Sequence, residues 1–189
     1  SGLTFDTRGE SHISERYSLP AGKQSVYENA ANEQALTFQK NGLTFTLRVR
    51  AYRNGLALRY ELAGADALSL MREETTLAFA PSFTNVFAQA LVPTYEGPYL
   101  PRAWPDMTGQ AYGMPLLLGA PQSGLWLLVS EADVLGKRGA WCSSHLLGAQ
   151  VGTLRLAAAL EDHGTPSPLA LPCASPWRIV TVAPDLDAL

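Results

Sequence analysis

The chain has 189 residues, of which 47% are hydrophobic, and it carries 14 lysines and arginines against 17 aspartates and glutamates. A net charge of −3 gives no electrostatic reason to bind nucleic acid or an anionic membrane. Its apolar runs are far shorter than the roughly 20 residues of a membrane-spanning helix. The length suits one large domain, which we expect over residues 1–189.

The first half of the chain predicts a meander of strands. A short helical turn is expected at residues 27–34, where Ser25 could cap it. Residues 35–62 then alternate apolar and polar side chains in three runs separated by Asn41-Gly42 and Asn54-Gly55, which predicts tight turns with positive φ. The middle run divides its side chains between two faces, with Phe45, Leu47, Val49 and Ala51 on one and Thr44, Thr46, Arg48 and Arg50 on the other.

Alternating runs continue to the end of the chain, at residues 73–80, 114–120, 123–132, 152–160 and 179–183. Glu73 and Glu74 fall on opposite faces of such a run, so we interpret them as a solvated strand end and not as an acid/base pair. A single sheet with so many apolar residues would leave one apolar face exposed to water. The predicted fold is therefore mostly β, with two packed antiparallel sheets.

Residues 83–112 differ, because they contain four prolines and several aromatic residues. This composition predicts a long irregular loop, and loops on rigid sheets often bind ligands. Tyr95, Glu96, Tyr99 and Trp104 offer the aromatic faces and polar groups that a sugar requires. The alternative is an aromatic loop that only packs.

Local catalytic motifs are absent, since the chain has no G-x-S-x-G, no phosphate-binding glycine loop and no H-E-x-x-H. His12, His145 and His163 lack the spacing of a metal site. Cys142 and Cys173 are interpreted as two partly buried thiols, with a disulfide between them left open.

Five segments, in the same order, resemble the N-terminal β-sandwich domain of glycoside hydrolase family 97. They are residues 27–38 (YENAANEQALTF), 50–62 (RAYRNGLALRYEL), 94–99 (TYEGPY), 123–134 (SGLWLLVSEADV) and 175–182 (SPWRIVTV). The resemblance implies a super-sandwich of the galactose-mutarotase type, followed in the complete enzyme by a catalytic (β/α)₈ barrel. It also implies a bacterial periplasmic or secreted protein.

Members of the family cleave α-glucosides or α-galactosides, typically with calcium, and their catalytic carboxylates lie on the barrel. The resemblance therefore implies that this chain alone is inactive and acts on α-linked saccharides only together with a barrel. It also implies that the sandwich gives one glutamate to the calcium site, with Glu131 the first choice and Glu96 the second. Trp177 is expected to cap the core, and Arg178 to pair with a carboxylate near the barrel interface.

The chain departs from the family in two places. A segment that in the family precedes the match to Ser1 is missing here, so we expect an exposed sheet edge through which the chain could dimerise. Gly119 and Ala120 stand where the family often has an acidic or polar residue, which weakens the transfer of the metal site.

Three functions compete at this point. An accessory domain of an α-glycosidase predicts a hydrophobic patch where the barrel docks and no activity alone. A free-standing carbohydrate-binding module predicts sugar binding through Tyr95, Tyr99 and Trp104. A mutarotase-like epimerase would need an acid and a base facing each other across one sheet, and the few histidines make it the weakest of the three.

Overall fold

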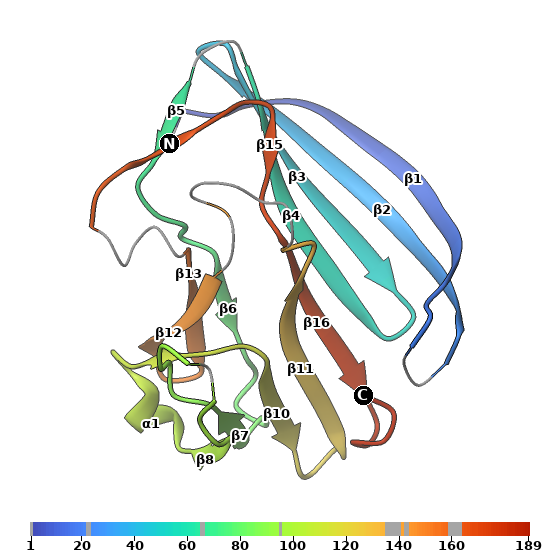
Figure 1. Ribbon diagram of the computed structural model, residues 1–189, viewed down its shortest axis with the longest axis vertical. Coiled ribbons are helices and arrows are strands. Elements are labelled where there is room, and N and C mark those ends of the chain that lie inside the picture. Colours follow the sequence, from blue (N-terminus) through green and yellow to red (C-terminus); the bar gives the residue numbers. More distant parts are fainter. Residues whose placement is uncertain are drawn as a thin grey trace.

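The computed structural model describes residues 2–21, 24–64, 67–94, 96–134, 141, 144–158 and 164–189. The expectations for Tyr95, Cys142 and His163 therefore fall outside the described residues. What is described is almost entirely β-strand, arranged in two layers (Figure 1). Within it, the single helix α1 (Trp104–Met107) has four residues, so no described helix could cross a membrane.

The described residues form three antiparallel sheets. The large sheet has ten strands in the order β1-β2-β3-β4-β16-β11-β10-β7-β8, with β15 paired to β4. Its strands are β1 (Thr4–Ser18), β2 (Val26–Lys40), β3 (Leu43–Tyr52), β4 (Gly55–Ala63), β7 (Asn85–Ala88), β8 (Leu100–Arg102), β10 (Leu116–Ala120), β11 (Leu125–Ala132), β15 (Cys173–Ala174) and β16 (Trp177–Ala183). The small sheet has β6 (Thr76–Ala78), β9 (Ala111–Tyr112), β12 (Ser144–Gln150) and β13 (Thr153–Ala158), while β5 (Leu68–Leu70) pairs with β14 (Ser167–Leu169).

The predicted meander is confirmed as β2, β3 and β4. Its first turn has the expected positive φ at Asn41 (48°) and Gly42 (78°). The second turn differs, because Gly55 is already the first residue of β4 and pairs with Tyr52. A Cβ on Gly55 would lie 2.3 Å from the Val180 carbonyl oxygen, so the close approach of β16 requires this glycine.

The expected helical turn at residues 27–34 is wrong, since these residues lie within β2. Each of these residues is paired with a residue of β1, and successive side chains point to opposite faces, so the period of two prevails over the possible cap at Ser25. β1 is the outermost strand of the large sheet among the described residues, and a bulge at Asp6 interrupts its register with β2. Dimerisation through this edge stays a prediction.

Residues 83–112 are more regular than expected. They contain β7, β8, α1 and β9, so a loop without secondary structure is not what forms. The buried side chains of Val86 and Ala88 explain β7, which pairs with both β10 and β8. The prolines keep these elements short without preventing them.

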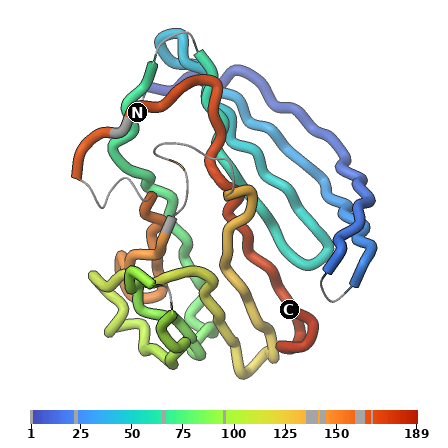
Figure 2. The backbone as a smooth tube through the Cα atoms, viewed as in Figure 1, coloured from blue at the N-terminus to red at the C-terminus, as the bar shows by residue number. Residues whose placement is uncertain are grey.

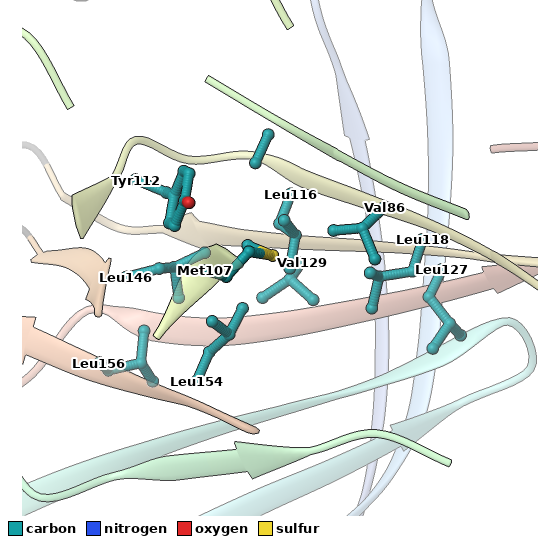
Figure 3. Packing of buried hydrophobic residues seen from close by; sticks show 11 residues of the cluster. Val86, Met107, Tyr112, Leu116, Leu118, Leu127, Val129, Leu146, Leu154 and Leu156 are labelled. Carbon is teal, nitrogen blue, oxygen red and sulfur yellow. The ribbon is translucent and has the colours of Figure 1, made fainter. Parts of the chain in front are cut away.

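The core lies where the small sheet covers the large one. Its main cluster joins β7, β10 and β11 of the large sheet to β12 and β13 of the small sheet, and Figure 3 shows the interdigitated side chains. It consists of Val86, Ala88, Met107, Tyr112, Leu116, Leu118, Leu127, Val129, Leu146, Leu154 and Leu156. We call the face of the large sheet that bears this cluster the inner face, and the opposite one the outer face.

The small sheet covers only part of the inner face. In Figure 2, β1 to β4 extend beyond the small sheet. The C-terminal run predicted from its flanking prolines is β16, and it lies between β4 and β11. Its alternation therefore divides Arg178, Val180 and Val182 from Trp177 and Ile179, with the first group inside and the second outside.

Candidate functional site

The predicted sugar-binding loop surrounds β8 and α1 at one end of the large sheet (Figure 1). Tyr99 is 45% exposed, and Glu96 is also exposed. Trp104 is anchored instead: its indole Nε1 donates to the Phe83 carbonyl at 2.8 Å, and its ring stacks on Phe79 at a centroid distance of 5.7 Å. Tyr99 and Glu96 are thus accessible to a ligand, while Trp104 holds the loop on the core.

Arg102, which the sequence did not single out, lies on β8 in the same region. Its guanidinium carbon is 5.8 Å from the centre of the Tyr112 ring, and its Nε is buried without a hydrogen-bond partner among the described residues. Together with Asp106 and Gln110 it lines a cavity of about 310 Å³. Burial raises the pKa of Tyr112, and the charge of Arg102 partly offsets this. The sequence feature that could have identified Arg102 is an arginine, with its planar guanidinium, close to two prolines.

A buried ion cluster lies on the inner face of the large sheet. Arg178, 2% exposed, donates from Nε and Nη2 to the Glu73 carboxylate at 3.3 and 2.7 Å, and from Nη1 to Glu131. Glu131 and Arg178 are opposite each other on β11 and β16. The guanidinium therefore holds two carboxylates in the space between the layers.

The interpretation of Glu73 as a solvated strand end is wrong. Its side chain is only 3% exposed, and it precedes β6 instead of belonging to that strand. Thr75 donates to its carboxylate at 2.8 Å, and Arg155 donates to its carbonyl at 2.7 Å. Contacts from the small sheet and from β16 turn Glu73 inward, and strand alternation cannot predict contacts of this kind.

The first and second choices for the one glutamate expected to contribute to a calcium site lie far apart in the sheet, so they stay alternatives. Glu131 is on β11, whereas Glu96 precedes β8, with β10 and β7 between these strands in the sheet. No group of three or more histidine, cysteine or acidic side chains with metal-binding geometry occurs among the described residues. Because calcium takes six to eight oxygen ligands, these residues do not form a complete calcium site.

The outer face carries a second ion network across β2, β3 and β4. Glu33 accepts from Arg48 Nη1 at 2.5 Å and from Arg50 Nε at 2.7 Å, and Arg48 also bonds Glu61 at 2.9 and 3.0 Å. Burial opposes the ionisation of Glu33, but the hydrogen bonds and charges of Arg50 and Arg48 outweigh it and lower the pKa. The hydrogen bond from Arg48 lowers the pKa of Glu61.

Trp177 belongs to the outer face and not to the core clusters that it was expected to cap. The guanidinium carbons of Arg50 and Arg59 lie 4.6 and 4.5 Å from its ring centre. Arg59 also pairs with Glu61 at 2.6 Å and with Asp133 at 3.6 Å. The ring is therefore buried between two cations that acidic side chains hold in place.

An apolar patch occupies the other half of the outer face, over β7, β10 and β11. It consists of Phe87, Leu117, Trp126 and Leu128, which are half-buried and belong to neither core cluster. Phe87 and Trp126 stack at 6.4 Å. A Cβ on Gly119 would lie 2.8 Å from the Trp126 ring, so this tryptophan explains why a larger residue is missing there.

Comparison with known families and structures gives one consistent result. The family profile described as "Glycosyl-hydrolase 97 N-terminal" matches residues 1–189. A search of curated proteins finds no match. Among solved structures, a glycoside hydrolase family 97 enzyme from Pseudoalteromonas sp. strain K8 in complex with acarbose superposes with a TM-score of 0.80 at 19% identity. A β-arabinopyranosidase gives 0.79 at 27% identity, and an α-galactosidase from Lactobacillus brevis gives 0.59 at 13%.

These matches cover nearly all of this chain but a minor part of the other proteins. They include 97%, 97% and 96% of the chain, and 28%, 32% and 27% of the three structures in the same order. The chain thus spans less than a third of the solved proteins that it resembles.

Proposed function

Because the chain belongs to the glycosyl-hydrolase 97 N-terminal family, we propose that it is the accessory domain of an α-glycosidase whose catalytic barrel follows it. The observation that carries this proposal is the outer-face apolar patch. Half-buried aromatic and leucine side chains that contact no core cluster are typical of a surface that another domain covers. The solved relatives are long enough to contain such a domain, because this chain covers only 28% and 32% of two of them.

The test is an association measurement between this chain and the remainder of the encoded protein, expressed separately. We expect Leu128→Asp to weaken association at least about tenfold, because it places a charge in the patch. Val151→Asp is the matched control, since Val151 is 63% exposed on the turn between β12 and β13. Equal affinity of both variants, or an encoded protein that ends at Leu189, would remove the proposed role.

We further propose that the loop around β8 forms part of the wall of the sugar pocket. Tyr99 and Glu96 are exposed, and Arg102, which is half-buried, supplies a planar guanidinium close to them in the sequence. The pocket would take α-linked oligosaccharides, because the solved family 97 enzyme from Pseudoalteromonas sp. strain K8 forms complexes with acarbose and with panose. In the complete enzyme, Tyr99→Ala should raise KM with little change in kcat. Trp104→Ala is a poor test, because it removes the loop's anchor on Phe79.

Calcium is the cofactor that the proposed function implies, and Glu131 is the residue of this chain proposed to contribute to it. Its carboxylate points to Arg178, and the part of the chain that the structure describes brings no group of three or more acidic, histidine or cysteine side chains together for a metal ion. Calorimetric titration of this chain with calcium should therefore give no binding. In the complete enzyme, Glu131→Gln should weaken calcium binding measured by the same method, and unchanged binding would exclude Glu131.

A further inference from the structure

A groove of about 330 Å³ crosses the outer face beside the ion network, away from the loop around β8. Its lining comes from the ends of β1 and β2, from the β3–β4 hairpin and from β16. The volume falls within the range of pockets that hold small ligands. The polar lining residues that matter here are Tyr17, Asn29, Arg50, Tyr52, Asn54 and Thr181.

The floor of the groove is held in a fixed geometry. Trp177 lies between Arg50 and Arg59, and Arg50 is in turn fixed by Glu33 through Nε at 2.7 Å. A ligand would therefore meet donors that are already oriented, so little conformational entropy would be lost on binding.

One wall of the groove offers an aromatic platform. Tyr17 and Tyr27 stack in parallel, with centroids 5.4 Å apart and an interplanar angle of 11°. Tyr17 is nevertheless 46% exposed, since Tyr27 covers only one of its faces. The Nδ2 atom of Asn29 donates to Glu15 at 3.1 Å, which orients this amide beside the platform.

The charge balance of the network indicates which class of ligand fits. The three arginines of the outer face, Arg48, Arg50 and Arg59, are matched by Glu33, Glu61 and Asp133. Arg50 is the one charged side chain among the described lining residues, and Glu33 pairs with it, so this lining offers no surplus positive charge that would favour an anion. Phenol and amide groups beside a flat ring suit the hydroxyls and the C–H faces of a neutral sugar.

We propose that this groove is a non-catalytic binding site for neutral oligosaccharides, and the choice of α-linked ones rests on the proposed function. It goes beyond the proposed function, because it uses the outer face of β1 to β4 and β16 and none of the residues around β8. Such a site would hold a saccharide on the accessory domain. Another part of the same saccharide, or a second saccharide molecule, could then occupy the catalytic pocket.

The experiment is calorimetric titration of this chain with maltotetraose and with stachyose, which present α-glucosyl and α-galactosyl units. We expect binding to at least one of them, and roughly tenfold weaker binding for Tyr17→Ala, which removes the platform. Tyr17→Phe should bind like the unmodified chain, and it guards against a folding defect in the alanine variant. Asn29→Ala should also weaken binding.

Tyr99→Ala separates this site from the proposed pocket wall. If the groove is the site, Tyr99→Ala leaves binding to the isolated chain unchanged. Binding that Tyr99→Ala abolishes and Tyr17→Ala leaves intact would overturn the groove and favour the loop around β8. Two outcomes would contradict the proposed groove site and leave the accessory-domain role in place. One is no detectable binding of either oligosaccharide, and the other is tighter binding of trigalacturonate than of either.

Discussion

Two ion clusters lie back to back across β16, at adjacent residues of one strand. On the inner face, Arg178 binds Glu73 and Glu131 and is 2% exposed. On the outer face, Trp177 lies between Arg50 and Arg59, whose side chains are 18% and 22% exposed. The same kinds of residue thus meet a dry environment on one side of the strand and a partly hydrated one on the other.

The difference in burial predicts how much each cluster contributes to the free energy of unfolding. Removing one partner of a buried pair leaves a charge that neither water nor protein neutralises, and this is costly. On the outer face, Glu33 is itself buried, but Arg48 and Arg50, which its substitution would leave behind, are 27% and 18% exposed, so water can solvate them and the cost is smaller. The ranking by burial is therefore a ranking of expected effects, and it can be tested at both faces.

The largest effect is expected for Arg178→Met on the inner face. It leaves two buried carboxylates without their cation and should lower the free energy of unfolding by about 3–5 kcal/mol, measured by urea denaturation. The matched control adds Glu73→Gln and Glu131→Gln to the same chain. This triple variant should recover part of the loss, whereas a loss below about 1 kcal/mol for Arg178→Met would mean that water reaches the cluster.

A smaller effect is expected for Glu33→Gln on the outer face, at about 1–3 kcal/mol at neutral pH, because two charged hydrogen bonds are weakened. The pKa of Glu33 in the folded chain is below the unfolded value of 4.5. Its ionisation therefore contributes stability above that pH, and this contribution is lost as the pH falls through the folded pKa.

Denaturation curves between neutral and acidic pH check this sign. The unmodified chain should lose stability in acid more steeply than Glu33→Gln. Glu28→Gln is the control, because Glu28 is an exposed residue of β2. If Glu33→Gln and Glu28→Gln gave the same acid dependence, the outer network would contribute nothing measurable.

Sequence alternation predicted the faces of these strands but not what covers them. The meander of β2 to β4 and the strand at 179–183 follow from period two and from turn residues, and both are present. The partner of Arg178 could not be found in this way, because Glu73 lies 105 residues away and outside any strand. Contacts made by connecting segments depend on the packing of the layers, which no local pattern encodes.

The candidate site shows the same limit. The aromatic residues around β8 were found from composition, yet composition could not distinguish the exposed Tyr99 from Trp104, which is anchored by Phe79 and Phe83. The groove at Tyr17 is formed by strands that are distant in the sequence, so no local sequence motif could predict it.

Arg59→Met should have a smaller effect than Glu33→Gln. It removes one of the two cations from the Trp177 ring but leaves Arg50 in place, so we expect a loss of about 0.5–2 kcal/mol. Arg53→Met is the matched control in the exposed β3–β4 turn. Thermal unfolding of the two variants makes the comparison, and equal melting temperatures would show that the second cation adds no stability.

The smallest effect is expected at the edge strand. Arg8 and Glu10 form a 2.5 Å ion pair on β1, but their side chains are 53% and 64% exposed, so Arg8→Ala should change stability by less than about 0.5 kcal/mol. Salt screens such a pair, so high ionic strength should abolish even this difference. A clear loss that grows with protein concentration would contradict the expectation, because it would mean that a second copy covers the pair. Sedimentation of the unmodified chain over the same concentrations would then detect the dimer that the exposed edge of β1 predicts.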